Sequence, residues 1–346
     1  MKNIIQKAVD IIRNTDCPPL RIMEVCGTHT HEIFRLGIRK ILPDHITMIS
    51  GPGCPVCVTP TSYIDEAVLL AAEKNVTICT FGDLVRVPGT ERSLADVRAA
   101  GGEVMTVYSP LDAEAYAREH PEKQVVFLSV GFETTTPADC LSVRAAEQDG
   151  IRNYAILTSN KTMPEAYRAM AGSTDVFLYP GHVHAITGVG ICRELREKGV
   201  SGVVAGFTAA ELTTAIAAIV LRAKTGEPFF ENCYPRVVRD EGNPAAMKII
   251  EEYMEPCDAE WRGIGSMKDS GLRLKEKWSA YDARIKFDLP ALTGRSHPAC
   301  RCGDILRGAC LPADCPLFGK VCTPDHPVGA CMVSGEGTCS AYYTYN

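Results

Sequence analysis

Short apolar runs rich in β-forming residues, separated by turns and helical stretches, constrain the fold of this chain most. The runs lie at residues 20–25, 46–50, 76–81, 103–108, 125–130, 154–159, 176–179 and 200–206. Helical stretches between them include residues 63–74, 137–148 and 164–170. Strands that alternate with helices predict an α/β fold, and continuous apolar runs suit parallel strands that helices cover on both faces.

So many runs predict two similar open parallel-sheet α/β domains, followed by a smaller C-terminal domain. The expected boundaries are an N-terminal helix at 1–19, α/β domain I at 20–120, α/β domain II at 121–228 and the C-terminal domain at 229–346. This last domain begins with a helical stretch at 245–253 and a charged segment. A (β/α)8 barrel is the alternative, but the helices are uneven and several connections are short for it.

The composition argues against two classes of partner. The chain has 36 Lys and Arg against 42 Asp and Glu and no basic run, so it offers no surface for nucleic acid. Its most apolar later region, residues 200–223, contains Glu211 and is interrupted by Gly202 and Gly206. Residues 1–16 predict an amphipathic helix rather than an export signal. We therefore expect a soluble cytoplasmic protein that binds neither nucleic acid nor membranes.

The chain contains 16 cysteines, and this number predicts metal ligation or redox chemistry because the cytosol keeps thiols reduced. The residues from Cys300 to Cys339 hold seven of them. Six others have no partner spacing and are expected to be structural: Cys17, Cys79, Cys140, Cys192, Cys233 and Cys257.

Polar loops follow four of the predicted strands. They read CGTHTHE at 26–32, GPGCPVC at 51–57, GFETTTP at 131–137 and PGHVH at 180–184. Ligands of open α/β sheets bind outside the carboxyl ends of the strands, so these loops indicate one site or two facing sites. Ordinary turn and cap residues are the alternative explanation for any single loop.

Cys54 and Cys57 have the CxxC spacing of a dithiol–disulfide couple or of half a metal site, and inert thiols are a third possibility. A helix expected to begin near residue 61 would place its positive end beside the pair and favour an ionised thiol. No second CxxC lies nearby in the sequence, as a zinc ribbon would require.

Cys26 ends the first predicted strand, and Thr28 and His29 follow it. A thiolate at this position is a soft ligand suited to low-spin iron or another thiophilic metal. The nearby imidazole should shift this thiol toward its ionised form. A buried strand-end cysteine is the alternative, with Thr28 as a helix cap.

Glu133, His182 and His184 are candidate supporting residues. Glu133 could orient a ligand or act as a base, although the threonines after it also suit an ordinary helix start. If residues 182–184 are extended, both imidazoles share one side, as two metal ligands would. A structural role for at least one of them is the alternative.

The C-terminal segment predicts a metal centre. The four cysteines concerned are Cys315, Cys322, Cys331 and Cys339. Four thiolates close a [4Fe-4S] cube, and apolar neighbours such as Phe318 and Met332 could keep it dry.

Structural zinc is the alternative for this segment, with His297 and His326 as extra ligands. Zinc modules usually pair cysteines two to four residues apart, however, and the four cysteines are not paired in this way. Cys300, Cys302 and Cys310 remain as substitute ligands or as a redox pair beside the cluster.

Several of these segments resemble the signature segments of the HypD family of hydrogenase formation proteins. They are EVCGTHTHEI, SGPGCPVCVTP, SVGFETTTP, YPGHVHAITG and the closing segment from CRCGDIL to SGEGTC. The resemblance extends from about residue 20 to residue 343. It implies two α/β domains, a C-terminal domain with a [4Fe-4S] cluster, and a role as scaffold and redox protein in the maturation of nickel-iron hydrogenases.

The resemblance also implies partners and residue roles. The chain would hold iron together with HypC while the Fe(CN)2CO centre is assembled, with cyanide delivered by HypE and HypF. Cys26 would hold the iron with His29 beside it, and Cys54 and Cys57 would be the redox pair. The cluster ligands would be Cys315, Cys322, Cys331 and Cys339.

Two other functions remain open on the residues alone. A cluster-dependent thiol–disulfide reductase would use Cys54 and Cys57 but would leave Cys26 and His29 without a role. A zinc-stabilised binding module would need no redox chemistry.

Overall fold

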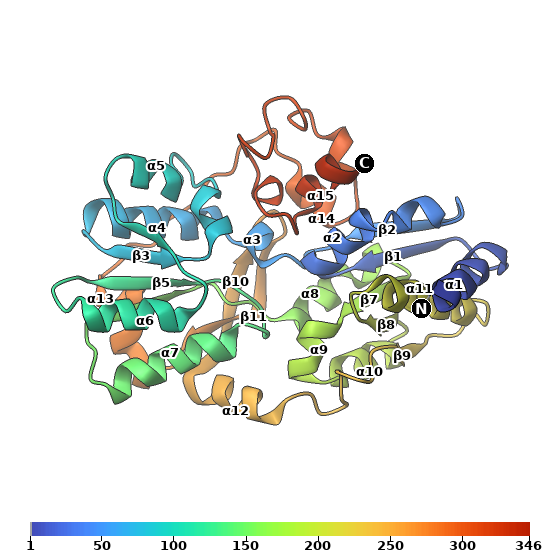
Figure 1. Cartoon of the computed structure of the whole chain (residues 1–346), viewed down its shortest axis with the longest axis horizontal. Helices are drawn as coiled ribbons and strands as arrows, with labels where there is room; N and C mark the ends of the chain where they lie inside the picture. Colours follow the sequence, from blue (N-terminus) through green and yellow to red (C-terminus); the bar gives the residue numbers. More distant parts are fainter. Residues whose placement is uncertain (1) are drawn as a thin grey trace.

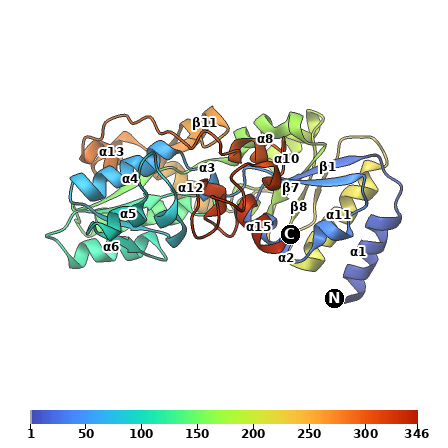
Figure 2. The ribbon, with the colours of Figure 1, turned by 90° about the horizontal axis from the view of Figure 1, so that it is seen from above.

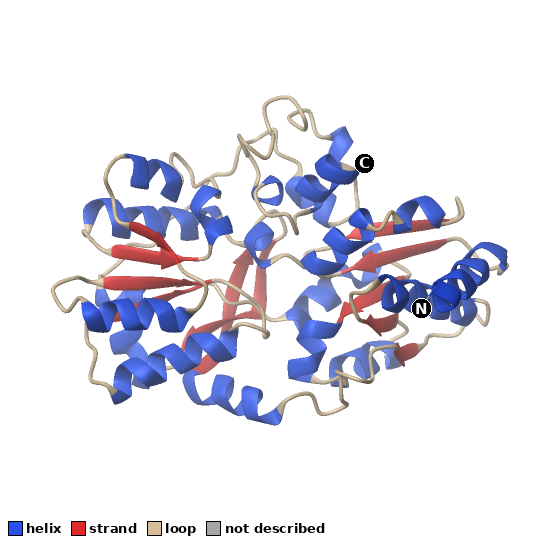
Figure 3. Cartoon of the chain, in the orientation of Figure 1, coloured by secondary structure: helices blue, strands red, loops and turns tan. Residues whose placement is uncertain are grey.

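Two open parallel sheets form the frame of the computed structural model, which describes residues 2–346 (Figures 1 and 3). One sheet has five strands in the order β2-β1-β7-β8-β9, and the other has four in the order β4-β3-β5-β6. The strands are β1 Leu20–Glu24, β2 Ile46–Ser50, β3 Thr77–Thr80, β4 Val104–Thr106, β5 Val125–Ser129, β6 Tyr154–Thr158, β7 Val176–Pro180, β8 Ser201–Ala205 and β9 Phe230–Asn232. The predicted α/β fold is confirmed, and each predicted strand is present.

Helices cover the sheets and carry ordinary start signals. The α-helices are α1 Lys2–Asn14, α2 Gly27–Arg35, α3 Pro55–Val58, α4 Thr61–Glu73, α5 Leu94–Ala99, α6 Pro110–Glu119, α7 Thr136–Gln148, α8 Met163–Met170, α9 Gly181–Thr187, α10 Gly190–Glu197, α11 Ala209–Ala223, α12 Pro244–Tyr253, α13 Ala283–Lys286, α14 Cys302–Leu306 and α15 Thr338–Tyr345. Capping boxes begin α5 at Ser93 and α11 at Thr208, where each side chain accepts from a backbone N–H in the first turn. The N-terminal helix is confirmed for residues 2–14, whereas Met1 lies outside the described residues.

Short 3-10 turns complete the regular structure. They are η1 Ile38–Ile41, η2 Gly82–Arg86, η3 Ala171–Ser173, η4 Glu276–Tyr281, η5 Pro312–Asp314 and η6 Ala330–Met332. Across residues 2–346, every helix is too short or too polar to cross a bilayer.

The strand pairing crosses the boundary expected near residue 120. The chain leaves the five-stranded sheet after β2, builds the four-stranded sheet with β3 to β6, and returns at β7. Ile78 of β3 pairs with Val126 of β5, although the two lie on opposite sides of that boundary. The two sheets therefore do not follow the expected division into residues 20–120 and 121–228. We call the part around the five-stranded sheet the first lobe and the part around the four-stranded sheet the second lobe.

An antiparallel hairpin and the C-terminal segment lie at the junction of the two lobes (Figures 1 and 2). The hairpin consists of β10 Met254–Trp261 and β11 Gly265–Leu274. Its two strands were not predicted from the sequence, because their polar, charged residues lack the apolar run that marks the buried strands. The C-terminal segment (residues 300–346) is mostly irregular, with only short helices between its loops.

A single apolar core extends across the junction. It combines Met23 and Tyr179 of the first lobe with Phe132 of the second, Trp261 of the hairpin and Met332 of the C-terminal segment. The loops that carry the predicted site residues are therefore packed against one another rather than separated by solvent.

Candidate thiol site at the lobe junction

The loops that carry Cys26 and Cys54 pack directly against each other. Cys26 follows β1 and immediately precedes α2, and Cys54 lies in the chain segment that crosses from the first lobe to the second. The N–H of Gly27 donates to the carbonyl of Gly53 at 2.9 Å. A Cβ on Gly53 would lie 1.9 Å from the backbone nitrogen of Cys26, so only glycine allows this approach. The GPGC sequence thus places the two cysteines side by side.

Cys54 and Cys57 share one helical turn. Cys54 begins the short helix α3, and its sulfur accepts a hydrogen bond from the N–H of Cys57 at 3.3 Å. The two side chains are 4% and 1% exposed, and both thiols are free. Burial raises the pKa of Cys57 well above the ordinary thiol value. The expected lowering by a helix end is therefore wrong for Cys57, because loss of hydration outweighs it.

Cys26 is a buried thiol at the N-terminus of α2. Burial raises its pKa to about 12, although the N–H groups of His29 and Thr28 act in the opposite direction. The expectation that its neighbours would ionise this thiol is wrong for the same reason as at Cys57. A metal ion that binds here must displace the proton.

His29 is fully buried next to Cys26. Its Nε2 lies 3.0 Å from the carbonyl of Gly206, which can only accept, so we assign the ring proton to Nε2. Its Nδ1 is buried without a partner. Burial lowers the pKa of His29 to about 4, so the imidazole is neutral and its Nδ1 lone pair is free.

The imidazoles of the PGHVH segment do not lie on one side of the backbone as predicted for an extended segment. The segment forms α9, in which residues two apart point in different directions. His182 is exposed and stacks on Phe207 with ring centroids 3.8 Å apart, and Phe207 also packs against His29 at 4.6 Å. His184 is buried in the core. It donates from Nδ1 to Gly188 and accepts at Nε2 from the hydroxyl of Tyr167, at 2.8 Å and 3.2 Å.

Glu336 of the C-terminal segment reaches the Cys26 loop, and sequence reasoning missed it. The hydroxyl of Thr28 donates to Glu336 at 2.6 Å, and the ring of His31 donates to the carbonyl of Gly335 at 3.1 Å. The negative charge of Glu336 also lies close enough to raise the pKa of Cys26 further. An acidic residue between two glycines, inside a cysteine-rich segment, is the signal that could have identified it.

A chain of sulfur contacts begins at Cys57 and continues into the C-terminal segment. The thiols of Cys57 and Cys302 lie beside the sulfur of Cys331, and this proximity lowers the pKa of Cys331 to about 6. Cys302 also lies beside Cys339, and it accepts from Cys300 with 3.3 Å between the sulfurs. We call these five residues the sulfur chain.

The other two predicted cluster ligands, Cys315 and Cys322, are buried beside the sulfur chain. The sulfur of Cys315 lies 3.9 Å from the carbonyl of Ala299. The sulfur of Cys322 accepts from the N–H of Val328 at 3.4 Å, and it lies within charge–charge range of Cys302. All four predicted ligands therefore lie in the C-terminal segment at the junction. Cys302, a substitute ligand in the prediction, lies among them as a neighbour of Cys322, Cys331 and Cys339.

The residues present fit an iron–sulfur cluster. The sulfurs are thiolate donors, and apolar side chains such as Phe318, Val328 and Met332 pack around them. Among residues 2–346, no three metal-binding side chains converge closely enough to hold a single ion. The ligands of a cube each bind a different iron and need not converge in that way. His297 and His326, the extra ligands of the zinc alternative, are exposed.

Glu133 connects two elements of the junction. Its Oε1 accepts from the N–H of Met163 at 2.9 Å, which links the loop after β5 to the start of α8. Its Oε2 is buried without a partner. Burial raises the pKa of Glu133 to about 7, so this carboxyl group takes up a proton near neutral pH.

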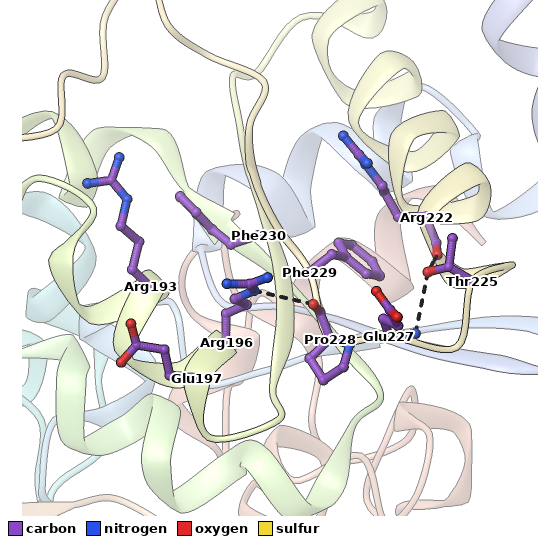
Figure 4. Close-up of a pocket in the computed structure, with 9 residues that line it drawn as sticks. All are labelled: Arg193, Arg196, Glu197, Arg222, Thr225, Glu227, Pro228, Phe229 and Phe230. Atoms are coloured by element: carbon purple, nitrogen blue, oxygen red, sulfur yellow. Dashed lines mark hydrogen bonds between the residues drawn. The ribbon is translucent and has the colours of Figure 1, made fainter.

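A separate surface pocket of about 420 Å³ lies in the first lobe (Figure 4). Its lining is Arg193, Arg196, Glu197, Arg222, Thr225, Glu227, Pro228, Phe229 and Phe230. None of these is a predicted site residue. Arg193 and Arg222 are already paired with Asp240 and Glu231, at 2.5 Å and 3.0 Å. This pocket therefore offers no chemistry related to the thiols.

Known proteins match the chain over nearly its full length. Residues 2–346 match the HypD family model, which is described as the hydrogenase formation hypA family. The chain is 40% identical to the hydrogenase maturation factor HypD of Rhodobacter capsulatus, over 99% of this chain and 93% of that protein. It is 41% identical to HypD of Azotobacter vinelandii, over 94% and 89% of the two chains. A hydrogenase expression/formation protein of Methanocaldococcus jannaschii is 41% identical, over 99% and 97%.

Proposed function

The chain belongs to the HypD family of hydrogenase maturation factors, and we propose that it is the scaffold and redox protein on which the Fe(CN)2CO centre of nickel-iron hydrogenases is assembled. One observation carries this proposal. The contact between the Gly27 and Gly53 loops places a single buried thiol, Cys26, beside a buried dithiol that leads into the sulfur chain.

Cys26 is the proposed ligand for the iron that the protein handles as substrate. A single protein thiolate leaves most of the coordination sphere open for cyanide, carbon monoxide and a second thiolate from HypC. The proton leaves Cys26 as the iron binds, since the thiol is otherwise protonated. The free Nδ1 of His29 is then available to accept a hydrogen bond from an arriving ligand.

Cys54 and Cys57 are the proposed redox pair. When they form a disulfide, the two thiols release two electrons and two protons. A [4Fe-4S] cluster held by cysteines of the C-terminal segment would accept or supply electrons one at a time. The contact from Cys57 to Cys331 connects the pair with that segment.

The proposed partners are HypC, which shares the iron, and HypE with HypF, which deliver cyanide. The proposed location is the cytoplasm, where thiols are kept reduced. In this proposal the protein is an assembly scaffold with redox activity rather than an enzyme that turns over a substrate.

A free-standing, cluster-dependent thiol–disulfide reductase fits this geometry less well. Thiol–disulfide exchange needs direct attack of one sulfur on another, so a substrate disulfide must reach the pair. Cys54 and Cys57 are almost fully buried, and Cys26 and His29 would have no role.

The test is anaerobic purification of the complex with HypC, followed by infrared spectroscopy in the metal-carbonyl and metal-cyanide region. Cys26→Ala should abolish these bands, because the iron loses its only thiolate from this chain, and should leave the absorbance of the cluster unchanged. Cys233→Ala is the matched control, since Cys233 lies outside the site. Full bands in the Cys26 variant would show that the iron is held elsewhere.

A further inference from the structure

Arg262 carries a buried positive charge that is not paired with a carboxylate. It lies in the turn between β10 and β11 and is 6% exposed. Its Nη2 donates to the carbonyl of Pro88 at 3.1 Å, whereas its Nη1 is buried without a partner. None of the ion pairs within residues 2–346 involves it. A guanidinium stays protonated in proteins, so some other group must balance this charge.

The potential anions around Arg262 are cysteines. Burial lowers its pKa, and Cys302, Cys300, Cys331 and Cys57 lie close enough to act against this lowering when their sulfurs are ionised, as they are when they bind a metal. These four residues belong to the sulfur chain. Arg262 therefore faces the sulfurs from the side of the hairpin.

The turn that carries Arg262 is held against both segments that supply these sulfurs. The N–H of Arg262 donates to the carbonyl of Val58, the residue after Cys57, at 2.8 Å. On the other side, a Cβ on Gly303 would lie 2.1 Å from the carbonyl oxygen of Gly263, and Arg307 donates to that oxygen at 2.6 Å. These contacts fix the turn that carries Arg262 relative to the two segments that supply the sulfurs.

We propose that Arg262 is a positioning residue whose charge stabilises the negative charge on the cysteines of the C-terminal segment and raises the reduction potential of the cluster that they hold. The proposal rests on the proposed function, because it requires a cluster. Each one-electron reduction adds one negative charge to the cluster and its thiolates, with the electron supplied by a chemical reductant. A nearby cation stabilises the reduced form more than the oxidised form, and a low local dielectric strengthens the effect.

The test is a potentiometric titration of the full-length, anaerobically purified protein, followed by electron paramagnetic resonance. Arg262→Met should shift the midpoint potential of the cluster to a more negative value, and Arg262→Lys should shift it less because the charge remains. Arg307→Gln is the matched control: it removes a contact with the same turn, but Arg307 is paired with Asp304, and its variant should titrate like the unmodified protein.

An Arg262→Met protein with full cluster absorbance and an unchanged midpoint would overturn this inference alone. An unmodified protein without any iron–sulfur cluster would overturn the proposed function as well. If thermal unfolding shows that the Met variant does not fold, Arg262→Gln takes its place, because it keeps a donor for Pro88 without the charge, and the same shift is expected.

Discussion

Cys26 and His29 lie one helical turn apart at the start of α2, and both are removed from water. Burial raises the pKa of the thiol to about 12 and lowers the pKa of the imidazole to about 4. At neutral pH the pair therefore holds no net charge. In the proposed function it offers iron a thiol that must lose its proton and a ring nitrogen with a free lone pair.

The free-energy cost of burying an imidazole can be measured at His184, which lies away from the proposed iron site. Its pKa falls from 6.5 to about 4 on folding, so between these values the unfolded state binds more protons. The stability gained from neutral His184 is complete above pH 6.5 and is lost as the pH falls through 6.5 toward 4. Between pH 7.5 and pH 5 we expect a loss of about 2 kcal/mol.

Urea unfolding at the two pH values tests this prediction. His184→Gln cannot take up this proton, so its stability deficit relative to the unmodified protein should be smaller at pH 5 than at pH 7.5. His326→Gln is the control, because His326 is exposed. A deficit of the same size at both pH values would show that His184 does not bind a proton on unfolding.

The sequence identified the thiols of the site better than their surroundings. Cys26 and Cys54 were expected together because both follow strands whose carboxyl ends lie on the same edge of a parallel sheet. Glu336 lies 308 residues from its partner Thr28, and Arg262 belongs to a hairpin that was not predicted. Such contacts depend on how distant segments pack, and the local sequence pattern does not encode this.

At the scale of elements, strand identity was predictable and strand pairing was not. Each buried strand is a continuous apolar run, so each could be recognised separately. Nothing in such runs distinguishes β3, which pairs with β5, from β1, which pairs with β7. The chain order suggested a division at residue 120, but the second lobe is inserted between β2 and β7. The loop after β2 therefore crosses between lobes, and this is why the CxxC turn lies at the junction.

Gly53→Ala tests the contact between the two loops. The added methyl group would overlap the backbone of Cys26, so the loops must separate. We expect the free energy of unfolding to fall by about 1–3 kcal/mol. Cys26 should also become reactive to an alkylating reagent under native conditions, which mass spectrometry would show.

Gly190→Ala is the matched control for this prediction. Gly190 begins α10, and a Cβ there meets no atom within 4 Å, so its variant should keep both its stability and the protection of Cys26. Equal behaviour of the two variants would mean that the close approach of Gly53 to Cys26 is not required.

At the scale of the whole molecule, the C-terminal segment joins the two lobes. It contacts the first lobe where Thr28 donates to Glu336. It contacts the second lobe where Arg86 donates to the carbonyls of Pro324 and Val333, at 2.8 Å and 3.3 Å. The segment has little regular structure of its own, so the proposed cluster would fix its shape by binding its cysteines. Cluster binding should therefore stabilise the junction as well as the segment.

Removal of the cluster by anaerobic oxidation and chelation tests this dependence. Hydrogen exchange followed by mass spectrometry should become faster in residues 300–339. It should also become faster in α2 and η2, because Thr28 and Arg86 lose fixed partners when the segment loosens. The buried strand β8 provides an internal control, since it is paired on both sides, with β7 and with β9. If faster exchange is confined to residues 300–339, the cluster orders its own segment without stabilising the junction between the lobes.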